Sequence, residues 1–322
     1  MSVWILAACS SSPPRTPSGP TPSPTPDAAG PPASAGHSLV YAAHLGMVVL
    51  TNAGLGGMTS PPQSAPTKVW GWTGQDWQLL DSSGPPVRNL AGVAYDTRRQ
   101  TLVMHGGTYA LGRSYGETWE WSGSWRQTGG NGPGVRDHTQ LAFDADRGRA
   151  VLFGGSGDDP NAAFADTWEY DGSTWTRVAT DGPGARVHHA MHYDPVRRRV
   201  VLVGGNTSGG QTLGDVWTWD GSRWSPAGSI GAPRSHARLT FDRGLDALVL
   251  AGGLPAAGLG VLVGRGPAWS PLATPSEPGA RYLTDIAYDE RRRVLVLFGG
   301  DSPGGVQSDT WEFDGSTWRR VR

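Results

Sequence analysis

The sequence predicts an all-β fold, a six-bladed β-propeller with four antiparallel strands in each blade. Three observations lead to this prediction. A unit of about 50 residues recurs six times, tryptophans stand in two columns of that repeat, and glycine pairs and Asp-Gly steps separate short apolar runs. The 48 glycines and the low share of charged residues, 17%, also favour short strands joined by tight turns over long surface helices.

The tryptophan columns define the repeat. The first column contains Trp70, Trp119, Trp168, Trp217 and Trp311, and the second contains Trp77, Trp125, Trp175, Trp224, Trp269 and Trp318. Another aromatic residue follows the first column two positions later, at Trp72, Trp121, Tyr170, Trp219 and Phe313. Because neighbours cover both faces of a propeller blade, we expect these side chains to form the core between blades rather than platforms for sugar stacking.

The third copy shows the four strands of one unit. Alternating apolar residues predict strands over 138–143, 150–153, 166–170 and 173–178. A polar turn begins at Asp144, Gly154-Gly155 ends the second strand, and Asp171-Gly172 is a hairpin signal. Links this short predict that consecutive strands pair in a meander.

The order of double glycine, aromatic strand and tryptophan strand resembles the kelch repeat over residues 37–322. The glycine pairs are Gly106-Gly107, Gly154-Gly155, Gly204-Gly205, Gly252-Gly253 and Gly299-Gly300. The first copy departs from the pattern with Asn52-Ala53, and the fifth has Leu262 in place of the first tryptophan and lacks the Asp-Gly turn. The resemblance implies a propeller and a binding face built from its loops.

A closed ring is expected because six small sheets must cap their ends or close on themselves, and no capping segment is visible. The repeat begins with an innermost strand and finishes with an outermost one. This order predicts that the first and last blades join by packing, without exchange of a strand.

The N-terminal residues suggest export. Leu6-Ala7-Ala8-Cys9 resembles the lipobox of bacterial lipoproteins, although the apolar run before it is short and has no positive charge. The resemblance implies a truncated signal peptide over 1–9, a lipid on Cys9, and an extracytoplasmic, membrane-anchored lipoprotein at the cell surface or in the periplasm. Most of residues 10–36 are Pro, Ser or Thr, which predicts a disordered linker. The propeller is then expected over 37–322.

Composition excludes several partners. The net charge is −1 and Lys68 is the single lysine, so no basic stripe for nucleic acid is present. No apolar run is long enough to cross a membrane as a helix. Cys9 is the only cysteine, so the fold cannot use a disulfide within the chain. We expect a monomer without a cofactor.

Arginines recur in the connections between blades, at Arg88, Arg136, Arg186, Arg234 and Arg281. Each lies seven residues before the aromatic residue that ends its strand, which predicts a ring about the mouth of the channel. Two interpretations stay open. Each arginine could bond a neighbouring blade's carboxylate, for which Glu117, Asp166, Asp215 and Asp309 are available, or the arginines could together receive an acidic ligand.

A binding site usually needs residues that differ between blades, and the loops supply them. Candidates on the loop face are Tyr109 and Tyr115 in the second blade and Asp158 and Asp159 in the third. His138, His188 and His236 follow the arginines by two residues and join these candidates. No cysteine lies near them, so we expect hydrogen-bonded structural histidines and no metal.

These features favour a lipid-anchored binding or scaffold module that engages an envelope or extracellular protein, peptide or glycan through its loop face. Galactose oxidase has a kelch-type domain, but its copper site uses a cross-linked cysteine, and Cys9 is the only cysteine here. Asp-Gly-Ser-Thr-Trp at 171–175 and 314–318 resembles the Asp-box of sialidases without its full spacing. A glycan-active enzyme of the sialidase type is therefore the alternative.

Overall fold

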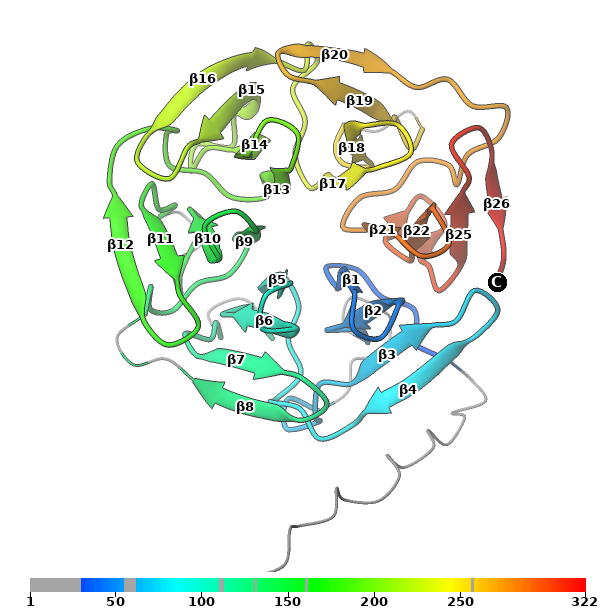
Figure 1. Cartoon of the computed structure of the whole chain (residues 1–322), viewed down its shortest axis with the longest axis horizontal. Coiled ribbons are helices and arrows are strands. Elements are labelled where there is room, and N and C mark those ends of the chain that lie inside the picture. Colours follow the sequence, from blue (N-terminus) through cyan, green and yellow to red (C-terminus); the bar gives the residue numbers. More distant parts are fainter. Residues whose placement is uncertain are drawn as a thin grey trace, which may run out of the picture.

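The computed structural model describes residues 30–54, 62–109, 113–128, 130, 132–159, 162–255 and 258–322. Within them, six four-stranded antiparallel sheets surround a central axis (Figure 1). The predicted all-β, six-bladed propeller is therefore confirmed. The predicted lipobox with Cys9, and most of the predicted linker, lie outside the described residues. Within those residues there is no apolar helix of the length that a bilayer crossing requires.

Each blade is a meander, and its strands are called first to fourth from the axis outward. The innermost strands are β1 (Ser38–Ala42), β5 (Gly92–Asp96), β9 (Gln140–Asp144), β13 (Ala190–Asp194), β17 (Arg238–Asp242) and β21 (Asp285–Asp289). The second strands are β2 (Met47–Thr51), β6 (Thr101–His105), β10 (Arg149–Phe153), β14 (Arg199–Asn206), β18 (Ala247–Ala251) and β22 (Val294–Phe298).

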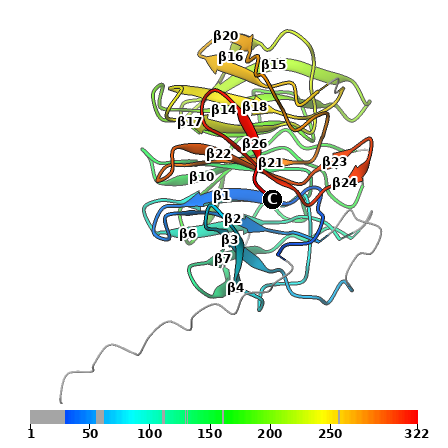
Figure 2. The ribbon, with the colours of Figure 1, turned by 90° about the vertical axis from the view of Figure 1, so that its right-hand side faces the viewer.

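The third strands are β3 (Val69–Trp72), β7 (Thr118–Trp121), β11 (Thr167–Tyr170), β15 (Thr212–Trp219), β19 (Leu262–Arg265) and β25 (Thr310–Phe313). The outermost are β4 (Trp77–Asp81), β8 (Trp125–Thr128), β12 (Trp175–Ala179), β16 (Trp224–Ser229), β20 (Ala268–Pro271) and β26 (Trp318–Arg320). We call the six sheets blades 1 to 6 in chain order. A hairpin of β23 (Asp301–Ser302) and β24 (Gly305–Val306) extends from blade 6 (Figure 2).

All four strand starts in blade 3 differ from the sequence prediction, the second and third by one residue and the first and fourth by two. The first strand begins at Gln140, because His138 has a positive φ of 52° and cannot continue a strand. The fourth begins at Trp175, because the carboxylate of Asp171 accepts bonds from the amides of Ser173 and Thr174 and holds them in the turn.

The outer strand of each blade meets the third strand of the blade before it. Where that preceding strand begins with threonine, the indole N–H of the second tryptophan column donates to the hydroxyl. The observed bonds are Trp77 to Thr310, Trp175 to Thr118 and Trp224 to Thr167, at 2.8 to 2.9 Å. Where valine takes the place of threonine, at Val69, Val216 and Val261, the indoles of Trp125, Trp269 and Trp318 have no hydrogen-bond partner among the described residues.

The ring closes without strand exchange, because all four strands of every blade come from one continuous segment of the chain. Blade 6 meets blade 1 as other neighbours meet. Trp77 reaches back to Thr310, Trp72 Nε1 donates to Glu312 at 2.7 Å, and Leu39 of blade 1 packs in one core cluster with Phe298 of blade 6. The predicted mode of closure is therefore what the structure shows.

The segment before β1 belongs to this closure. The amide of Gly300 in blade 6 donates to the carbonyl of Ser34 at 2.8 Å, and the amide of Ser34 donates to Gln307 at 3.0 Å. The propeller's contacts therefore extend upstream of residue 37, where the sequence places the start of the domain.

The expected aromatic core is present, with a difference between columns. The aromatic residues that follow the first column are all buried, as are Trp77, Trp175, Trp224 and Trp318 of the second. In the first column only Trp70 is buried, and Trp119, Trp168, Trp217 and Trp311 are half-buried. The last three donate their indole N–H to the aspartate two residues before them, at Asp166, Asp215 and Asp309.

Candidate functional site

The loops predicted to share one face do so. Each connection between blades pairs through a single bridge with the segment that follows the double glycine of the next blade. The bridged pairs are Asn89 with Thr108, Asp137 with Ser156, Val187 with Asn206, Ser235 with Leu254 and Tyr282 with Asp301. We call this side of the disc the loop face; the β23–β24 hairpin stands on it (Figure 2).

Four of the five predicted arginines form ion pairs inside their blades. Arg136 binds Asp166 through two bonds of 2.7 and 2.8 Å, and Arg186 binds Asp215 through two of 2.8 and 2.9 Å. Arg281 binds Asp309 at 2.8 and 3.3 Å, and Arg88 lies 3.2 Å from Glu117. All four arginines are buried. The carboxylate belongs to the blade that the arginine's connection leads into, not to a neighbour as the sequence suggested.

Each of these arginines also fastens the glycine turn of its blade. Nη1 donates to the carbonyl of the first glycine of the pair, at 3.0 to 3.1 Å from Gly106, Gly154, Gly204 and Gly299. Although burial alone would raise them, hydrogen bonds from the arginine and the indole N–H hold the pKa values of Asp166, Asp215 and Asp309 below the usual range.

Blade 5 is the exception. Arg234 has no carboxylate partner among the described residues and instead donates to the carbonyls of Gly252 and Gly260. Burial without a counter-charge lowers the pKa of this guanidinium. Blade 5, which lacks the first tryptophan, thus also lacks the acid that stands two residues before it in blades 2, 3, 4 and 6.

These contacts support the structural interpretation of the arginines. A guanidinium that is buried, bonded bidentately to a carboxylate and bonded to a backbone carbonyl has few donors left for a ligand. Arg88 is also covered by the ring of Tyr115, whose centroid lies 3.8 Å away. The arginines therefore hold the connections and glycine turns in place beneath the loop face. They do not form a ring around an open channel entrance.

A closed ring of backbone hydrogen bonds lies two residues further along each connection. The amide of one residue from each blade donates to the carbonyl of its counterpart in the neighbouring blade, at 2.8 to 3.3 Å. The six residues are Gly36, Leu90, His138, His188, His236 and Leu283, and all have positive φ. Because the ring joins all six blades two residues before their innermost strands, it constricts the loop-face end of the central channel.

The three predicted histidines are members of this ring, and their side chains gather. The rings of His188 and His236 stack with centroids 3.6 Å apart, and His138 meets His188 edge-on at 4.3 Å. Burial lowers the pKa of His236 to about 4 and lowers that of His188 further. The described residues hold no group of three or more potential ligands placed to bind a metal ion.

His138 also belongs to a small network with Asp137 and Ser156. His138 Nδ1 and Ser156 Oγ both bond the same carboxylate oxygen of Asp137, at 2.7 and 2.5 Å. In a nucleophilic triad the serine would bond the other imidazole nitrogen. This arrangement therefore orders the loop and does not activate the serine.

The predicted loop residues lie at the boundaries between blades. Tyr115 Oη accepts a bond from Gln63 Nε2 of blade 1 at 3.2 Å, and Asp158 of blade 3 accepts the amide of Ser114 at 3.3 Å. Tyr109 is half-buried, and Asp158 and Asp159 are exposed. The loop residues are therefore brought to one face, where they link blades 1 to 3.

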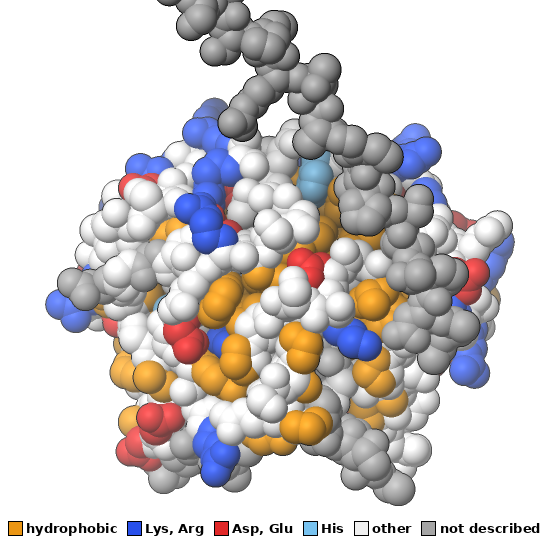
Figure 3. All heavy atoms as spheres, turned by 90° about the horizontal axis from the view of Figure 1, so that it is seen from below, with side chains coloured by type: hydrophobic (Ala, Val, Ile, Leu, Met, Phe, Trp, Pro, Cys, Tyr) orange, Lys and Arg blue, Asp and Glu red, His pale blue; other side chains and the backbone are white. Residues whose placement is uncertain are grey.

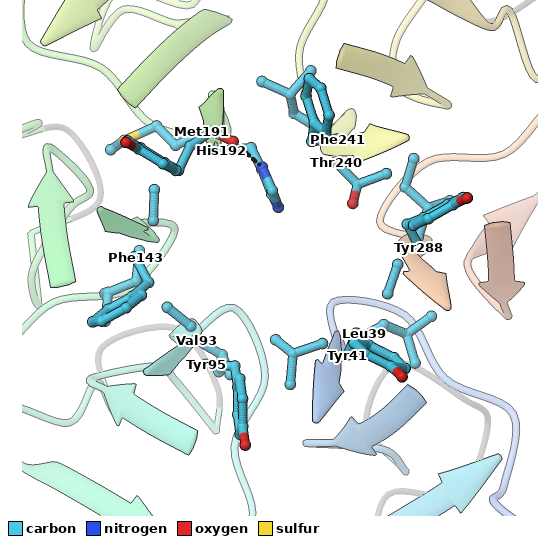
Figure 4. A pocket seen from close by; sticks show the side chains of 18 of the residues that line it. Leu39, Tyr41, Val93, Tyr95, Phe143, Met191, His192, Thr240, Phe241 and Tyr288 are labelled. Atoms are coloured by element: carbon cyan, nitrogen blue, oxygen red, sulfur yellow. Dashed lines mark hydrogen bonds between the residues drawn. The ribbon is translucent and has the colours of Figure 1, made fainter. Parts of the chain in front are cut away.

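A cavity of about 420 Å³ lies on the axis, where the sequence predicted a channel but no site residues. All six innermost strands line it (Figure 4). Its lining runs from Gln140, Arg238 and Asp285, two residues beyond the backbone ring, to the exposed residues Ala43, Thr97 and Arg243 at the turns on the opposite face. The cavity therefore opens away from the loop face.

The polar residues of the cavity are unevenly placed. One position before the strand-ending aromatic, His192 and Thr240 occupy blades 4 and 5, and His192 points toward the axis (Figure 4). The same position holds Val40, Ala94, Ala142 and Ala287 in the other blades. This position can be aligned between the six repeats in the sequence. That its residues face a common cavity follows only from closure of the ring.

Charged side chains are dispersed on the side of the disc that faces the viewer in Figure 3, with Lys or Arg and Asp or Glu both present among uncharged side chains. That distribution agrees with the net charge of −1.

Strand order, blade number and axial cavity together define a six-bladed, kelch-like β-propeller. No protein-family model and no curated protein matches the sequence. Among solved structures, the structure of YjhT, a kelch-repeat protein, is similar, with a TM-score of 0.68 and 12% sequence identity over 90% of this chain and 98% of that chain. At this identity the similarity shows the fold alone.

Proposed function

We propose that the protein is an extracytoplasmic binding module, held at the membrane by a lipid on Cys9, that engages a protein, peptide or glycan through the loop face. The observation that carries the proposal is the set of four internal arginine–carboxylate pairs. They fasten the loops rigidly, which reduces the entropy that binding would cost. Recognition then falls to residues that differ between blades, above all Tyr109, Tyr115, Asp158 and Asp159.

The same observation disfavours the alternative, a glycan-active enzyme of the sialidase type. Such an enzyme needs arginines that receive the substrate's carboxylate, and here Arg136, Arg186 and Arg281 already bind carboxylates of the protein. The Asp-box-like aspartates Asp171 and Asp314 accept bonds from the serine and threonine amides of their own hairpin turns. Those contacts are structural.

The test is a binding screen of the purified chain against immobilised peptides and glycans, run beside a turnover screen with labelled glycosides. We expect a ligand whose affinity falls roughly tenfold in Tyr115→Ala or Asp158→Ala, a loss of about 1.4 kcal/mol. Ser222→Ala, on the exposed turn before β16, is the control and should bind like the wild type. Glycoside turnover that Arg186→Ala abolishes in a folded protein would favour the enzyme.

The anchor has a separate test. Labelled fatty acid should enter the wild-type protein in a bacterial host and should not enter Cys9→Ser. Equal labelling of both would remove the lipid anchor and leave the loop-face proposal standing.

A further inference from the structure

The axial cavity differs from the loop face in its location and its residues. It has one constricted end, formed by the hydrogen-bonded ring, and one end at the exposed turns. A cavity of about 420 Å³ lies within the range that small-molecule sites occupy. Its walls are largely apolar, with Leu39, Val40, Val93 and Ala142 among them.

Two charged side chains lie at the inner end of this cavity, on neighbouring blades. Arg238 begins β17 in blade 5, and Asp285 begins β21 in blade 6. Both are buried, with 6% and 12% of the side-chain surface exposed. Blades 1 to 4 have Ser38, Gly92, Gln140 and Ala190 at the same position, so the charges occur once in the ring.

The hydrogen bonds of this pair are incomplete. Arg238 Nε lies 3.7 Å from Asp285 Oδ1, which is an ion pair but longer than a hydrogen bond. Asp285 accepts the amides of Leu39 and Ile286 at 2.9 and 2.8 Å. Arg238 donates no side-chain hydrogen bond to any other described residue. Since a guanidinium carries five N–H donors and buried donors are normally satisfied, these donors are available to a molecule in the cavity.

The charges fix the class of that molecule. Arg238 and Asp285 together are neutral, so a charged ligand would leave a net charge buried between apolar walls, which is costly. A neutral group that accepts a hydrogen bond from Arg238 and donates one to Asp285 leaves no imbalance. Amides and hydroxyls have both capacities.

We propose that the axial cavity binds a neutral amphiphilic small molecule, whose amide or hydroxyl head meets Arg238 and Asp285 and whose hydrocarbon body lies against the apolar walls. His192 and Thr240 offer further polar contacts along one side of the body. The site opens on the face opposite the loop face, so it does not depend on the loop-face function.

The test uses the full chain and the neutral fluorophore 1-N-phenylnaphthylamine, whose emission rises in apolar surroundings. We expect it to bind and to be displaced by octanamide. Octanoate and octylamine have the same chain length but carry a charge, and we expect them to need roughly tenfold higher concentrations near neutral pH, which corresponds to about 1.4 kcal/mol. A fluorophore that does not bind, or a charged competitor that displaces it best, would overturn the proposal.

Variants locate the site. Ala43→Trp places a large side chain at the exposed mouth and should weaken fluorophore binding at least several-fold. Ala268→Trp, the same change on the exposed outer strand β20, should bind like the wild type. Equal binding by both would place the fluorophore elsewhere and contradict the proposal.

The head group is tested by Asp285→Asn and, without any mutation, by pH. Burial raises the pKa of Asp285 to about 6 despite the opposing charge of Arg238, so acid removes the negative charge. Both changes should reduce the preference for octanamide over an anionic competitor, because Arg238 then lacks a counter-charge. The competitor is octanoate for the variant and octyl sulfate for the pH comparison, because octyl sulfate stays anionic at pH 5 whereas octanoate takes up protons. A preference that is unchanged in the variant and between about pH 7.5 and pH 5 would exclude Asp285 from the site.

Discussion

At the residue scale, the arginine–carboxylate pairs illustrate how one repeated side chain fixes a loop. Arg186 bonds the Asp215 carboxylate and the Gly204 carbonyl at once, and both groups would lose this partner without it. Removal of one partner of a buried pair is expensive, because the other charge stays buried and unpaired. Repetition of these contacts in blades 2, 3, 4 and 6 makes them part of the fold's construction.

We therefore expect Arg281→Ala to lower the free energy of unfolding by about 4 kcal/mol, measured by urea denaturation, because Arg281 and Asp309 are both buried, with 5% and 7% of their side chains exposed. Arg223→Ala is the matched control, since Arg223 is 78% exposed and lies 3.7 Å from Asp220. The control should change stability by no more than about 0.5 kcal/mol. A similar small loss in both variants would show that the buried pair contributes little.

Buried histidines make the protein sensitive to acid. His37, His105 and His189 are fully buried, and desolvation lowers the pKa of each to about 3, against about 6.5 in the unfolded chain. The unfolded state therefore takes up protons first, and stability is lost as the pH falls from about 6.5 toward 3. Asp285 acts in the opposite sense, because its raised pKa favours the folded state as the pH falls through 6.

His37, His105 and His189 against Asp285 give a fall in the free energy of unfolding of at least roughly 4 kcal/mol between about pH 7 and pH 5, and His188 and His236, whose pKa values are also lowered, add to it. Urea denaturation at a series of pH values measures it. His189→Gln should make the slope shallower by about 1.4 kcal/mol per pH unit below 6.5, whatever its effect on absolute stability. An unchanged slope in that variant would mean that His189 is protonated in the folded protein.

At the element scale, the strands followed from the period of the sequence, but several roles did not. Tryptophan spacing and Asp-Gly steps locate the hairpins, since those features are local. His138 looks like the first residue of a strand, and its positive φ arises only because the backbone ring joins neighbouring blades. The sequence placed the partner of Arg186 among the acids that precede the first tryptophan column. Which blade supplies that acid depends on the path of the connection.

The structure explains why two glycines follow the second strand of a blade, which the sequence alone did not. The amide of Gly107 donates to the carbonyl of Arg136 in the next connection at 2.7 Å, and a Cβ on Gly106 would overlap that carbonyl oxygen. Gly123, also at positive φ, has nothing within 4 Å of an added Cβ. Gly106→Ala should therefore cost at least about 3 kcal/mol, and Gly123→Ala about 1 kcal/mol, in urea denaturation. Equal losses of stability in the two variants would show that the positive φ, and not the contact with the Arg136 carbonyl, requires glycine at position 106.

The alternation of threonine and valine opposite the outer tryptophans permits a paired experiment. Thr167→Val removes the acceptor for Trp224 and should lower stability by about 1 kcal/mol. Val216→Thr offers Trp269 an acceptor of the same shape, and it should be neutral or stabilising by up to about 1 kcal/mol. Thermal unfolding followed by tryptophan fluorescence compares both with the wild type. A loss of stability in Val216→Thr would contradict the proposed role of the threonine.

At the scale of the whole molecule, closure of the disc produces features that no single repeat contains. The axial cavity exists because six innermost strands face one another, and its two buried charges come from different blades. Column positions such as His192 and Thr240 are visible in the sequence, but nothing local shows that they converge. One repeat thus predicts the strand that lines the axial cavity, whereas the cavity and its charged pair depend on the assembly of all six repeats.

The residues before β1 complete the ring, since Ser34 and Gly36 take in blade 1 the places that an arginine and a histidine take in blade 4. Gly36 accepts the amide of Leu90 in blade 2 and donates to Leu283 in blade 6, both at 2.8 Å. Deletion of residues 30–36 from the full chain would remove four backbone hydrogen bonds, those of Ser34 with Gln307 and Gly300 and those of Gly36 with Leu283 and Leu90. Since each hydrogen bond contributes about 1 kcal/mol, we expect a loss of at least 3 kcal/mol in urea denaturation. Deletion of residues 15–21 removes the same length of chain from the predicted linker and should leave stability unchanged. If both deletions behave alike, blades 1 and 6 are held by side-chain packing alone.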